Sequence, residues 1–285
     1  MGALAAAGRF LVFCIGLPLV LGASPLGACT RTLRWELQPP YGVERPDGVR
    51  AGYYTEAAVE ALARMGCAAV IVEMPWARGL RELEDGRLDL MPGMLENRER
   101  RRFAHFSRGI NLSPNLLFLT AGAARRHPLR NLGDLRDTGL KVAIETGAYY
   151  SAEYASLLTD PRFLARLHPV PDRQRAWRML ENGRIDGVIA DQASALVAGV
   201  PLRPGADDVR PVLVLSSAPA RIALSRRSVD AAFVRRFDAA IDTMVDDGFL
   251  LRLRERYVPC ATDPVTLGCR VEAGAEAGLP PAPPR

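Results

Sequence analysis

Lysine and histidine are scarce in this chain. Of its 285 residues, 37 are lysine or arginine, yet Lys141 is the only lysine, and there are three histidines, His105, His127 and His168. The histidines are scattered and lack the spacing of metal ligands, so we expect no metal site. The arginines are spread along the chain without interleaved aromatic residues, which argues against nucleic-acid binding despite a formal net charge of +5.

Sequence motifs of several catalytic classes are also absent. The chain contains no Gly-x-Ser-x-Gly motif, which positions the nucleophile of α/β-hydrolases. It contains no glycine-rich loop of the kind that binds phosphate groups. The sequence therefore contains little signal for catalysis, and we expect no cofactor.

Only one hydrophobic run is long, and it lies near the N-terminus. Residues 10–21 are apolar and follow Arg9, but the run is shorter than the roughly 18 to 20 residues that cross a bilayer. Small residues come next, so we expect a secretory signal peptide over residues 1–28, cleaved after Ala23 or Ala28. The mature protein is then expected in the periplasm.

Four cysteines follow the signal peptide, an even number that suits an oxidising compartment. Cys260 and Cys269 enclose a short loop and could pair locally. Cys29 and Cys67 each precede a strand-like apolar run, and adjacent strands would bring them together. We expect both disulfides. The alternative is that Leu26-Gly-Ala-Cys29 is a lipobox and Cys29 carries a lipid, which would leave Cys67 without a partner.

A heptapeptide occurs twice in the chain. Residues 83–89 read Leu-Glu-Asp-Gly-Arg-Leu-Asp and residues 180–186 read Leu-Glu-Asn-Gly-Arg-Ile-Asp. An amphipathic run precedes each copy and a short apolar run ends it, which predicts a helix, a glycine that closes it, and a buried strand. The repeat predicts two α/β lobes built alike, with ligands at the carboxyl ends of parallel strands.

Two extended apolar segments, residues 115–120 and 220–225, are expected to connect the lobes. Their positions predict that the second lobe is inserted into the first through a two-strand hinge suited to closure. The expected division is lobe 1, residues 29–117 with 221–262; lobe 2, residues 118–220; and a mostly disordered C-terminal tail, residues 263–285, rich in Ala, Gly and Pro toward its end.

Over roughly residues 32–257 the chain resembles the polar amino-acid family (family 3) of periplasmic solute-binding proteins, because a series of motifs occurs in the order found in that family. The motifs are Pro-Pro-Tyr at 39–41, Gly-Tyr-Tyr-Thr-Glu at 52–56, the repeat at 83–89, Gly-Met with a later Arg at 93–100, Phe-Ser at 106–107, and Gly-Arg-Ile-Asp with a later Asp at 183–191. The resemblance implies a two-lobed, type II Venus-flytrap fold of the α/β class. It also implies a monomeric receptor that captures a small polar or zwitterionic ligand for the permease of an ABC importer or for a sensor.

The resemblance further implies ligand contacts. Arg100 corresponds to the arginine that holds the ligand carboxylate as a fork, and Asp191 to the aspartate that receives its ammonium. Asn97 stands where the family has threonine, and Gly147 is followed by Ala148 instead of Thr or Ser. Two hydroxyl donors to the carboxylate are missing, which leaves small anions or zwitterions other than a standard α-amino acid open.

Three further residues are candidates for the ligand site, namely Tyr41 and Trp76 at the carboxyl ends of strands and Arg78 at the start of a helix. Each assignment has a structural alternative. Tyr41 and Trp76 could be packed in the core, Asp191 could cap the next helix, and Arg100 lies in an arginine-rich run that could be a solvated face.

Two other functions use the same fold. One is a periplasmic enzyme similar to cyclohexadienyl dehydratase, with Glu145 or Glu36 as its general acid. The other is an accessory subunit of a periplasmic oxidoreductase. The binding function is favoured because the sequence contains so little catalytic signal.

Overall fold

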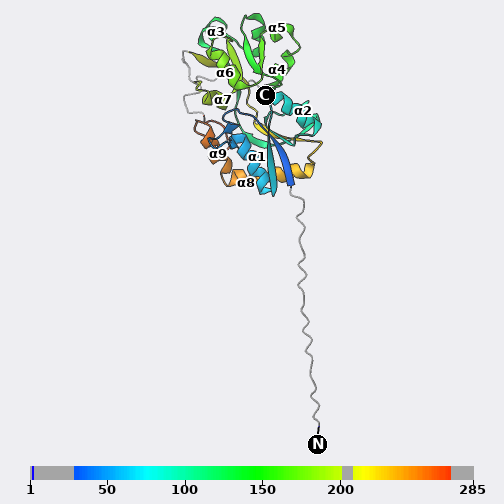
Figure 1. The fold of residues 1–285 in the computed structure, drawn as a ribbon. Helices are drawn as coiled ribbons and strands as arrows, with labels where there is room; N and C mark the ends of the chain where they lie inside the picture. Colours follow the sequence, from blue (N-terminus) through cyan, green and yellow to red (C-terminus); the bar gives the residue numbers. More distant parts are fainter. Residues whose placement is uncertain (1, 3–28, 201–207, 271–285) are drawn as a thin grey trace.

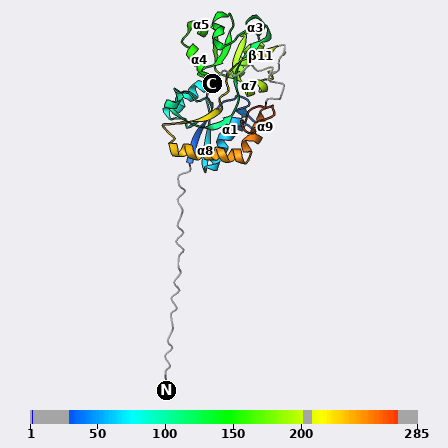
Figure 2. The ribbon, with the colours of Figure 1, turned by 180° about the vertical axis from the view of Figure 1, so that it is seen from behind.

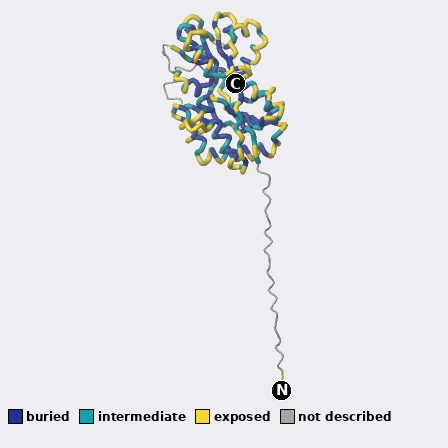
Figure 3. Tube along the Cα trace, in the orientation of Figure 1, coloured by how far each residue is buried: buried dark blue, intermediate teal, exposed yellow. Residues whose placement is uncertain are grey.

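The computed structural model describes residues 2, 29–200 and 208–270. The expected signal peptide, apart from residue 2, and residues 271–285 of the expected tail lie outside the described residues. Two five-stranded sheets, each covered by helices, form two lobes that lie one above the other in Figure 1. Buried residues concentrate along the strands inside each lobe, and exposed residues lie mainly on the outer helices and loops (Figure 3).

The first lobe contains the sheet with strand order β4-β1-β5-β12-β6. Strand β1 pairs in parallel with β4 and β5, whereas β12 runs antiparallel to β5 and β6. The strands are β1 (Cys29–Trp35), β4 (Cys67–Glu73), β5 (Leu90–Met94), β6 (Ala104–Asn111) and β12 (Ala220–Ser225), with a small ribbon of β2 (Val43–Glu44) and β3 (Arg50–Ala51). The helices are α1 (Tyr53–Arg64), α2 (Trp76–Asp85), η1 (Arg100–Arg102), α8 (Ala231–Asp246) and α9 (Phe249–Tyr257).

The second lobe contains the sheet with strand order β11-β7-β10-β8-β9. Strands β10, β8 and β9 are parallel, and β7 runs antiparallel to β10 and β11. The strands are β7 (Asn115–Thr120), β8 (Val142–Glu145), β9 (Leu167–Val170), β10 (Gly187–Asp191) and β11 (Val209–Ser216). The helices are α3 (Ala121–Arg126), η2 (Leu132–Asp137), α4 (Ala152–Leu157), α5 (Pro161–Leu164), α6 (Arg173–Glu181) and α7 (Gln192–Val197).

The chain passes between the sheets twice, from β6 to β7 and from β11 to β12. The second lobe is therefore inserted into the first, as the sequence predicts, and the view from behind shows the same two layers (Figure 2). The passages occupy residues 112–114 and 217–219, a few residues from the expected lobe limits. The apolar segments 115–120 and 220–225 do not themselves connect the lobes, because they pair within the second and the first sheet as β7 and β12. Their apolar side chains are largely buried in the lobe cores.

The repeated heptapeptide forms the predicted helix, glycine and strand in both lobes. Gly86 and Gly183 have φ angles of 79° and 63°, a left-handed conformation that glycine adopts without strain. The last aspartate of each copy also has the same role. Asp89 accepts a hydrogen bond from the backbone N–H of Thr32 at 2.8 Å, and Asp186 accepts one from the backbone N–H of Lys141 at 2.8 Å. Each aspartate thus ties its strand to the neighbouring parallel strand.

Both expected disulfides are present. Cys29 and Cys67 are register partners on β1 and β4, with their Cα atoms 4.5 Å apart. The sulfur of Cys29 is bonded to that of Cys67, as the disulfide interpretation predicts. Cys260 and Cys269 are bonded with a Cα separation of 5.6 Å, so that the first residues of the expected tail form an ordered loop. No helix in the described part of the chain is both long and apolar enough to span a membrane.

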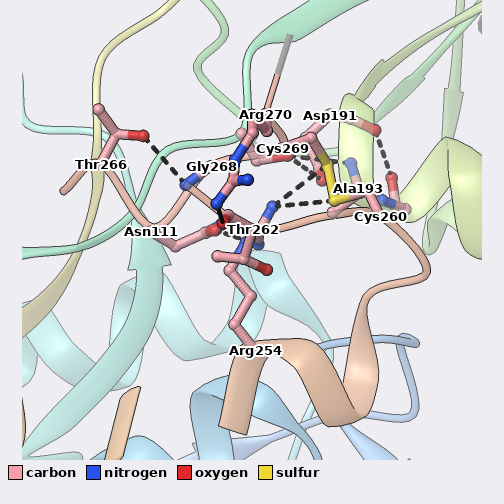
Figure 4. The surroundings of a disulfide bond; sticks show 12 residues. Asn111, Asp191, Ala193, Arg254, Cys260, Thr262, Thr266, Gly268, Cys269 and Arg270 are labelled. Carbon is pink, nitrogen blue, oxygen red and sulfur yellow. Dashed lines mark hydrogen bonds between the residues drawn. A yellow bond between two sulfur atoms is a disulfide. The ribbon is translucent and has the colours of Figure 1, made fainter. Parts of the chain in front are cut away.

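The second disulfide covers a fully buried arginine beside the first interlobe passage (Figure 4). Arg254 of α9 donates to the side-chain oxygen of Asn111, the last residue of β6, and one of its nitrogens lies 3.5 Å from the sulfur of Cys269. Asn111 in turn donates to the hydroxyl of Tyr54 at 3.2 Å. The disulfide loop and α9 therefore fix the end of β6 where the hinge begins.

Replacing each disulfide with serines is expected to lower the free energy of unfolding unequally. The chain-entropy model gives about 4 kcal/mol for the separation of 38 residues between Cys29 and Cys67, and about 2.5 kcal/mol for the separation of 9 residues between Cys260 and Cys269. Urea titrations of the two double-serine variants should show the larger loss for the first pair. A larger loss for the second pair would mean that its packing over Arg254 outweighs loop closure.

Candidate functional site

A cavity lies between the lobes, at the carboxyl ends of parallel strands from both sheets. Its charged lining residues come from both sides. The first lobe contributes Arg34, Glu36 and Arg100, and the second lobe contributes Arg173 and Asp191. Aromatic side chains complete the wall, among them Tyr41 and Trp76 from the first lobe and Tyr149 and Tyr150 from the second.

Arg100 is a buried cation with a side-chain environment drawn from both lobes. It is 5% exposed, and its guanidinium donates to the carbonyl of Leu95 at 3.0 Å and to the carbonyl of Gly147 at 3.2 Å. The guanidinium also lies 5.9 Å from the ring centre of Trp76 and 5.7 Å from that of Tyr149. Burial lowers the pKa of Arg100 to about 10, so the group is still charged near neutral pH.

Arg100 forms no ion pair within the described residues. The other arginines of its run, Arg98, Arg101 and Arg102, are exposed, so the solvated-face interpretation holds for these three and not for Arg100. Asn97 accepts the backbone N–H of Arg100 at 2.8 Å and so shapes the turn that holds the arginine. A buried guanidinium without a carboxylate partner is well suited to bind an anionic group of a ligand.

Asp191 lies at the end of β10, where it lines the cavity and also caps α7. Its Oδ1 accepts the backbone N–H of Ser194 at 3.0 Å, the hydroxyl of Ser113 at 2.9 Å, and the hydroxyl of Tyr41. Its Oδ2 accepts a hydrogen bond from Arg173. Burial alone would raise the pKa of Asp191, but Arg173 and these donors outweigh burial and leave it below its usual value.

Arg173, at the start of α6, holds two carboxylates of the second lobe. It pairs with Asp191 and, through Nε, with the Oε2 of Glu145 at 3.1 Å. Burial would lower the pKa of Arg173, but the two carboxylates outweigh it and raise the value. Glu145 ends β8, is 1% exposed, and its Oε1 has no hydrogen-bond partner. One cation for two carboxylates leaves this cluster with a formal charge of −1.

A second charged pair lies on the opposite wall. Arg34 is near the end of β1 and Glu36 directly follows that strand. The guanidinium of Arg34 lies 5.1 Å from the ring centre of Trp76. Burial raises the pKa of Glu36 to about 7, with Arg34 acting against this shift and Glu145 adding to it. With Glu36 ionised, Arg34, Glu36 and Arg100 give the first-lobe wall a formal charge of +1. The cavity is therefore polarised, positive at Arg100 and negative across from it.

Four of the seven expected site residues line the cavity, whereas Asn97 and Gly147 do not line it and instead each form a hydrogen bond with Arg100. Arg100, Asp191, Tyr41 and Trp76 line the cavity, and the carbonyl of Gly147 accepts hydrogen bonds from both Trp76, at 3.3 Å, and Arg100. Tyr41 and Trp76 are also packed, being 5% and 6% exposed, so the two interpretations of these residues are compatible.

Arg78 is not at the cavity. Its side chain is 62% exposed and lies 3.6 Å from Glu82 on the outer face of α2. The helix begins at Trp76, which faces the cavity, and a position two residues later is rotated by about 200° around the axis. Both residues therefore cannot face the same side.

Several lining residues were not identified from the sequence, namely Arg34, Gln38, Tyr149, Tyr150 and Arg173. Arg34 carried little signal, because its strand also contains Thr30, Arg31 and Thr32. Arg173 carried none, since it is one of several arginines in its helix. No group of three or more histidine, cysteine or acidic side chains in the described ranges is placed to hold a metal ion.

The architecture is similar to that of solved amino-acid-binding proteins. A variant of the arginine-binding protein ArgBP from T. maritima has 21% identity and a TM-score of 0.66, with 80% of this chain and 94% of that chain covered. A putative L-cystine ABC transporter protein from Listeria monocytogenes has 20% identity and a TM-score of 0.68, with 81% and 96% covered. An ancestral amino-acid-binding protein described as a precursor of cyclohexadienyl dehydratase has 18% identity and a TM-score of 0.63, with 80% and 95% covered.

At these identities the structural similarity establishes the fold. No curated protein matches the sequence. The family is established by the sequence itself, because residues 35–259 match the model of one family. The chain belongs to the bacterial extracellular solute-binding proteins, family 3.

Proposed function

We propose that this protein is a periplasmic receptor that captures a small zwitterionic ligand, an amino acid or a related compound, between its two lobes. The observation that carries the proposal is the polarity of the cavity. On one wall lies Arg100, a buried arginine that forms no ion pair in the described residues. On the other wall, the single cation Arg173 pairs with two carboxylates, so that this cluster has a net negative charge. A ligand with one negative and one positive group would neutralise both.

Arg100 would hold the ligand's carboxylate. A guanidinium has five N–H donors, and the carbonyls of Leu95 and Gly147 use two of them. The remaining donors can form the parallel pair that a carboxylate accepts, and the two carbonyl contacts fix the orientation of the group beforehand. The missing Thr and Ser hydroxyls place more of the carboxylate recognition on this one side chain.

Ligand binding would favour the closed arrangement of the lobes. The described interlobe contacts at the cavity are the hydrogen bond from Tyr41 to Asp191 and those from Trp76 and Arg100 to Gly147. A ligand that also bridges the walls adds contacts that exist only when the lobes are together, so it shifts the population toward closure. The expected partner of the closed form is the permease of an ABC importer or a membrane sensor.

A dehydratase-like enzyme is the second candidate function, because Glu36 has the properties of a general acid. It lines the cavity and its pKa of about 7 would let it give up a proton near neutral pH. Turnover of a cyclohexadienyl acid by the protein, abolished in Glu36→Gln, would support the enzyme. Binding without turnover would support the receptor.

The role of Arg100 is tested by comparing it with its exposed neighbour Arg102. A thermal-shift screen of amino acids, opines and small carboxylates provides the ligand. Arg100→Ala should then weaken binding at least thirtyfold, or about 2 to 5 kcal/mol, because it leaves the ligand anion unpaired in a desolvated site. Arg102→Ala should cost under about 0.5 kcal/mol. Equal affinities in calorimetric titrations would show that the carboxylate is not bound at Arg100.

Closure predicts a change in the overall dimensions of the protein. Saturating ligand should reduce the radius of gyration measured by small-angle X-ray scattering, because the two lobes approach each other. Arg100→Ala at the same ligand concentration serves as the control and should scatter like the ligand-free protein. Identical profiles for the native protein with and without ligand would contradict the hinge.

A further inference from the structure

The first lobe has an open groove at the end of its sheet that lies opposite the cavity. The cavity is lined by Trp35, the last residue of β1, and by Ala220, the first residue of β12. The groove is lined instead by Arg31, near the start of β1, and by residues 226–230, which directly follow β12. In Figure 1 this end of the lobe is the lower edge, where β1 begins and α8 crosses. The groove is therefore separate from the ligand site.

Arginines dominate the lining of this groove. It contains four, namely Arg31, Arg226, Arg227 and Arg236. None of the four forms an ion pair within the described residues. The acidic residue of the lining, Asp230, accepts the backbone N–H of Phe233 at 2.7 Å and so caps α8. Four arginines and one aspartate give the groove a formal charge of +3.

Three of these guanidinium groups are held by contacts that leave donors free. The Nε of Arg226 donates to two backbone carbonyls beside the start of β6, at 2.9 and 3.1 Å. Arg31 and Arg236 lie over the ring of Phe233, with their guanidinium carbons 4.8 and 5.6 Å from its centre. These contacts position the side chains and leave most of their N–H groups available to an anion.

The charge of the groove and its spread over the chain indicate an occupant with several anionic groups. A guanidinium matches the paired oxygens of a phosphate or carboxylate, so one such anion pairs well with one or two arginines. The groove presents four arginines, from β1, from the turn after β12 and from α8. One small anion would leave much of this charge unbalanced, whereas an extended anionic surface would face all four groups.

The position of the groove in the chain favours a membrane surface over an acidic protein. The expected signal peptide ends at residue 28, and Cys29 begins β1 two residues before Arg31. During export, this end of the first lobe is therefore the part of the protein next to the membrane that the signal peptide enters. Anionic lipid headgroups attract arginines close to the surface, and the attraction decays within about 10 Å at 0.1 M salt.

We propose that this groove docks the protein on the anionic phospholipid headgroups of the membrane surface. The inference goes beyond the proposed function, because the groove and the ligand cavity lie at opposite ends of the first sheet. Docking holds the receptor near its membrane partners without a covalent anchor. The second lobe lies across the cavity from the groove, so its arginines stay outside the range of the lipid charge.

Two double variants that lower the net charge equally test the docking. Arg227→Gln with Arg236→Gln removes two arginines of the groove, and neither side chain forms a hydrogen bond with another described residue. Arg175→Gln with Arg178→Gln removes two exposed arginines of α6 in the second lobe and is the matched control. All four positions are exposed, so the fold should be retained in both variants.

Co-sedimentation of the full mature protein with lipid vesicles measures the docking at about 0.1 M salt. Vesicles of equal parts phosphatidylglycerol and phosphatidylcholine should bind the native protein at least roughly tenfold more tightly than pure phosphatidylcholine vesicles. The groove variant should bind the anionic vesicles about thirtyfold more weakly, because each arginine near such a surface contributes about fivefold. The control variant should bind within about threefold of the native protein. Millimolar inorganic phosphate, added at constant ionic strength, should not displace the native protein.

Three results would overturn the proposal. Equal losses in the two double variants would show that binding follows net charge and not the groove. Failure of the native protein to bind anionic vesicles would exclude the membrane as the occupant, and binding of polyglutamate in its place would point to an acidic protein. Displacement by millimolar phosphate would make the groove a site for a free anion. None of these results bears on ligand capture, which is measured separately at the cavity.

Discussion

The organisation of the cleft depends on one arginine held between two carboxylates. Arg173 satisfies Asp191 and one oxygen of Glu145, and it does so from the first residue of a helix in the second lobe. Without this cation, two buried acids would lie together, and at least one would take up a proton. With it, Asp191 stays ionised and can accept the hydroxyl of Tyr41 from the other lobe. A local ion pair thereby supports the contact between lobes.

A second buried arginine, in the first lobe, supports the hinge. Arg254 lies under the Cys260–Cys269 disulfide and binds Asn111, which contacts Tyr54, and Tyr54 stacks on Tyr41 with ring centres 4.0 Å apart. The interior of the first lobe is thus connected to the cavity wall through polar and aromatic contacts. Because the disulfide loop buries Arg254 fully, the contacts of its guanidinium with Asn111 and with the sulfur of Cys269 have to offset the loss of its hydration.

The features that could be predicted from the sequence are those set by local pattern. The repeated heptapeptide predicts the helix ends and central strands of both lobes, since a left-handed glycine acts within a few residues. The hydrogen bonds of its aspartates to the neighbouring strands span 57 and 45 residues and could not be predicted. Arg100 was found through its place in a family motif, although sequence alone does not distinguish it from the exposed Arg101 and Arg102. Its burial arises because Leu95, Trp76 and Gly147 surround it, and these come from distant parts of the chain.

The features that could not be predicted depend on which residues share a spatial edge. Asp191 has the helix-capping role that any aspartate before a helix can have, yet its interlobe hydrogen bond depends on Tyr41, 150 residues away. Arg78 fails as a site residue because helix geometry turns it outward, although it is two residues from one that lines the cavity. Pairings between carboxylates and arginines are especially hard to infer in a chain whose arginines are so numerous.

The hydrogen bonds to the carbonyl of Gly147 make part of the contact between the lobes independent of pH. Their donors are the indole N–H of Trp76, which does not titrate, and the guanidinium of Arg100, whose pKa is about 10. Between pH 5 and 8 this interlobe contact keeps its protons, whereas Glu36 in the cavity changes charge. A fall in pH over this range would therefore change the charge of the cavity at Glu36 and leave the hydrogen bonds to Gly147 between the lobes unchanged.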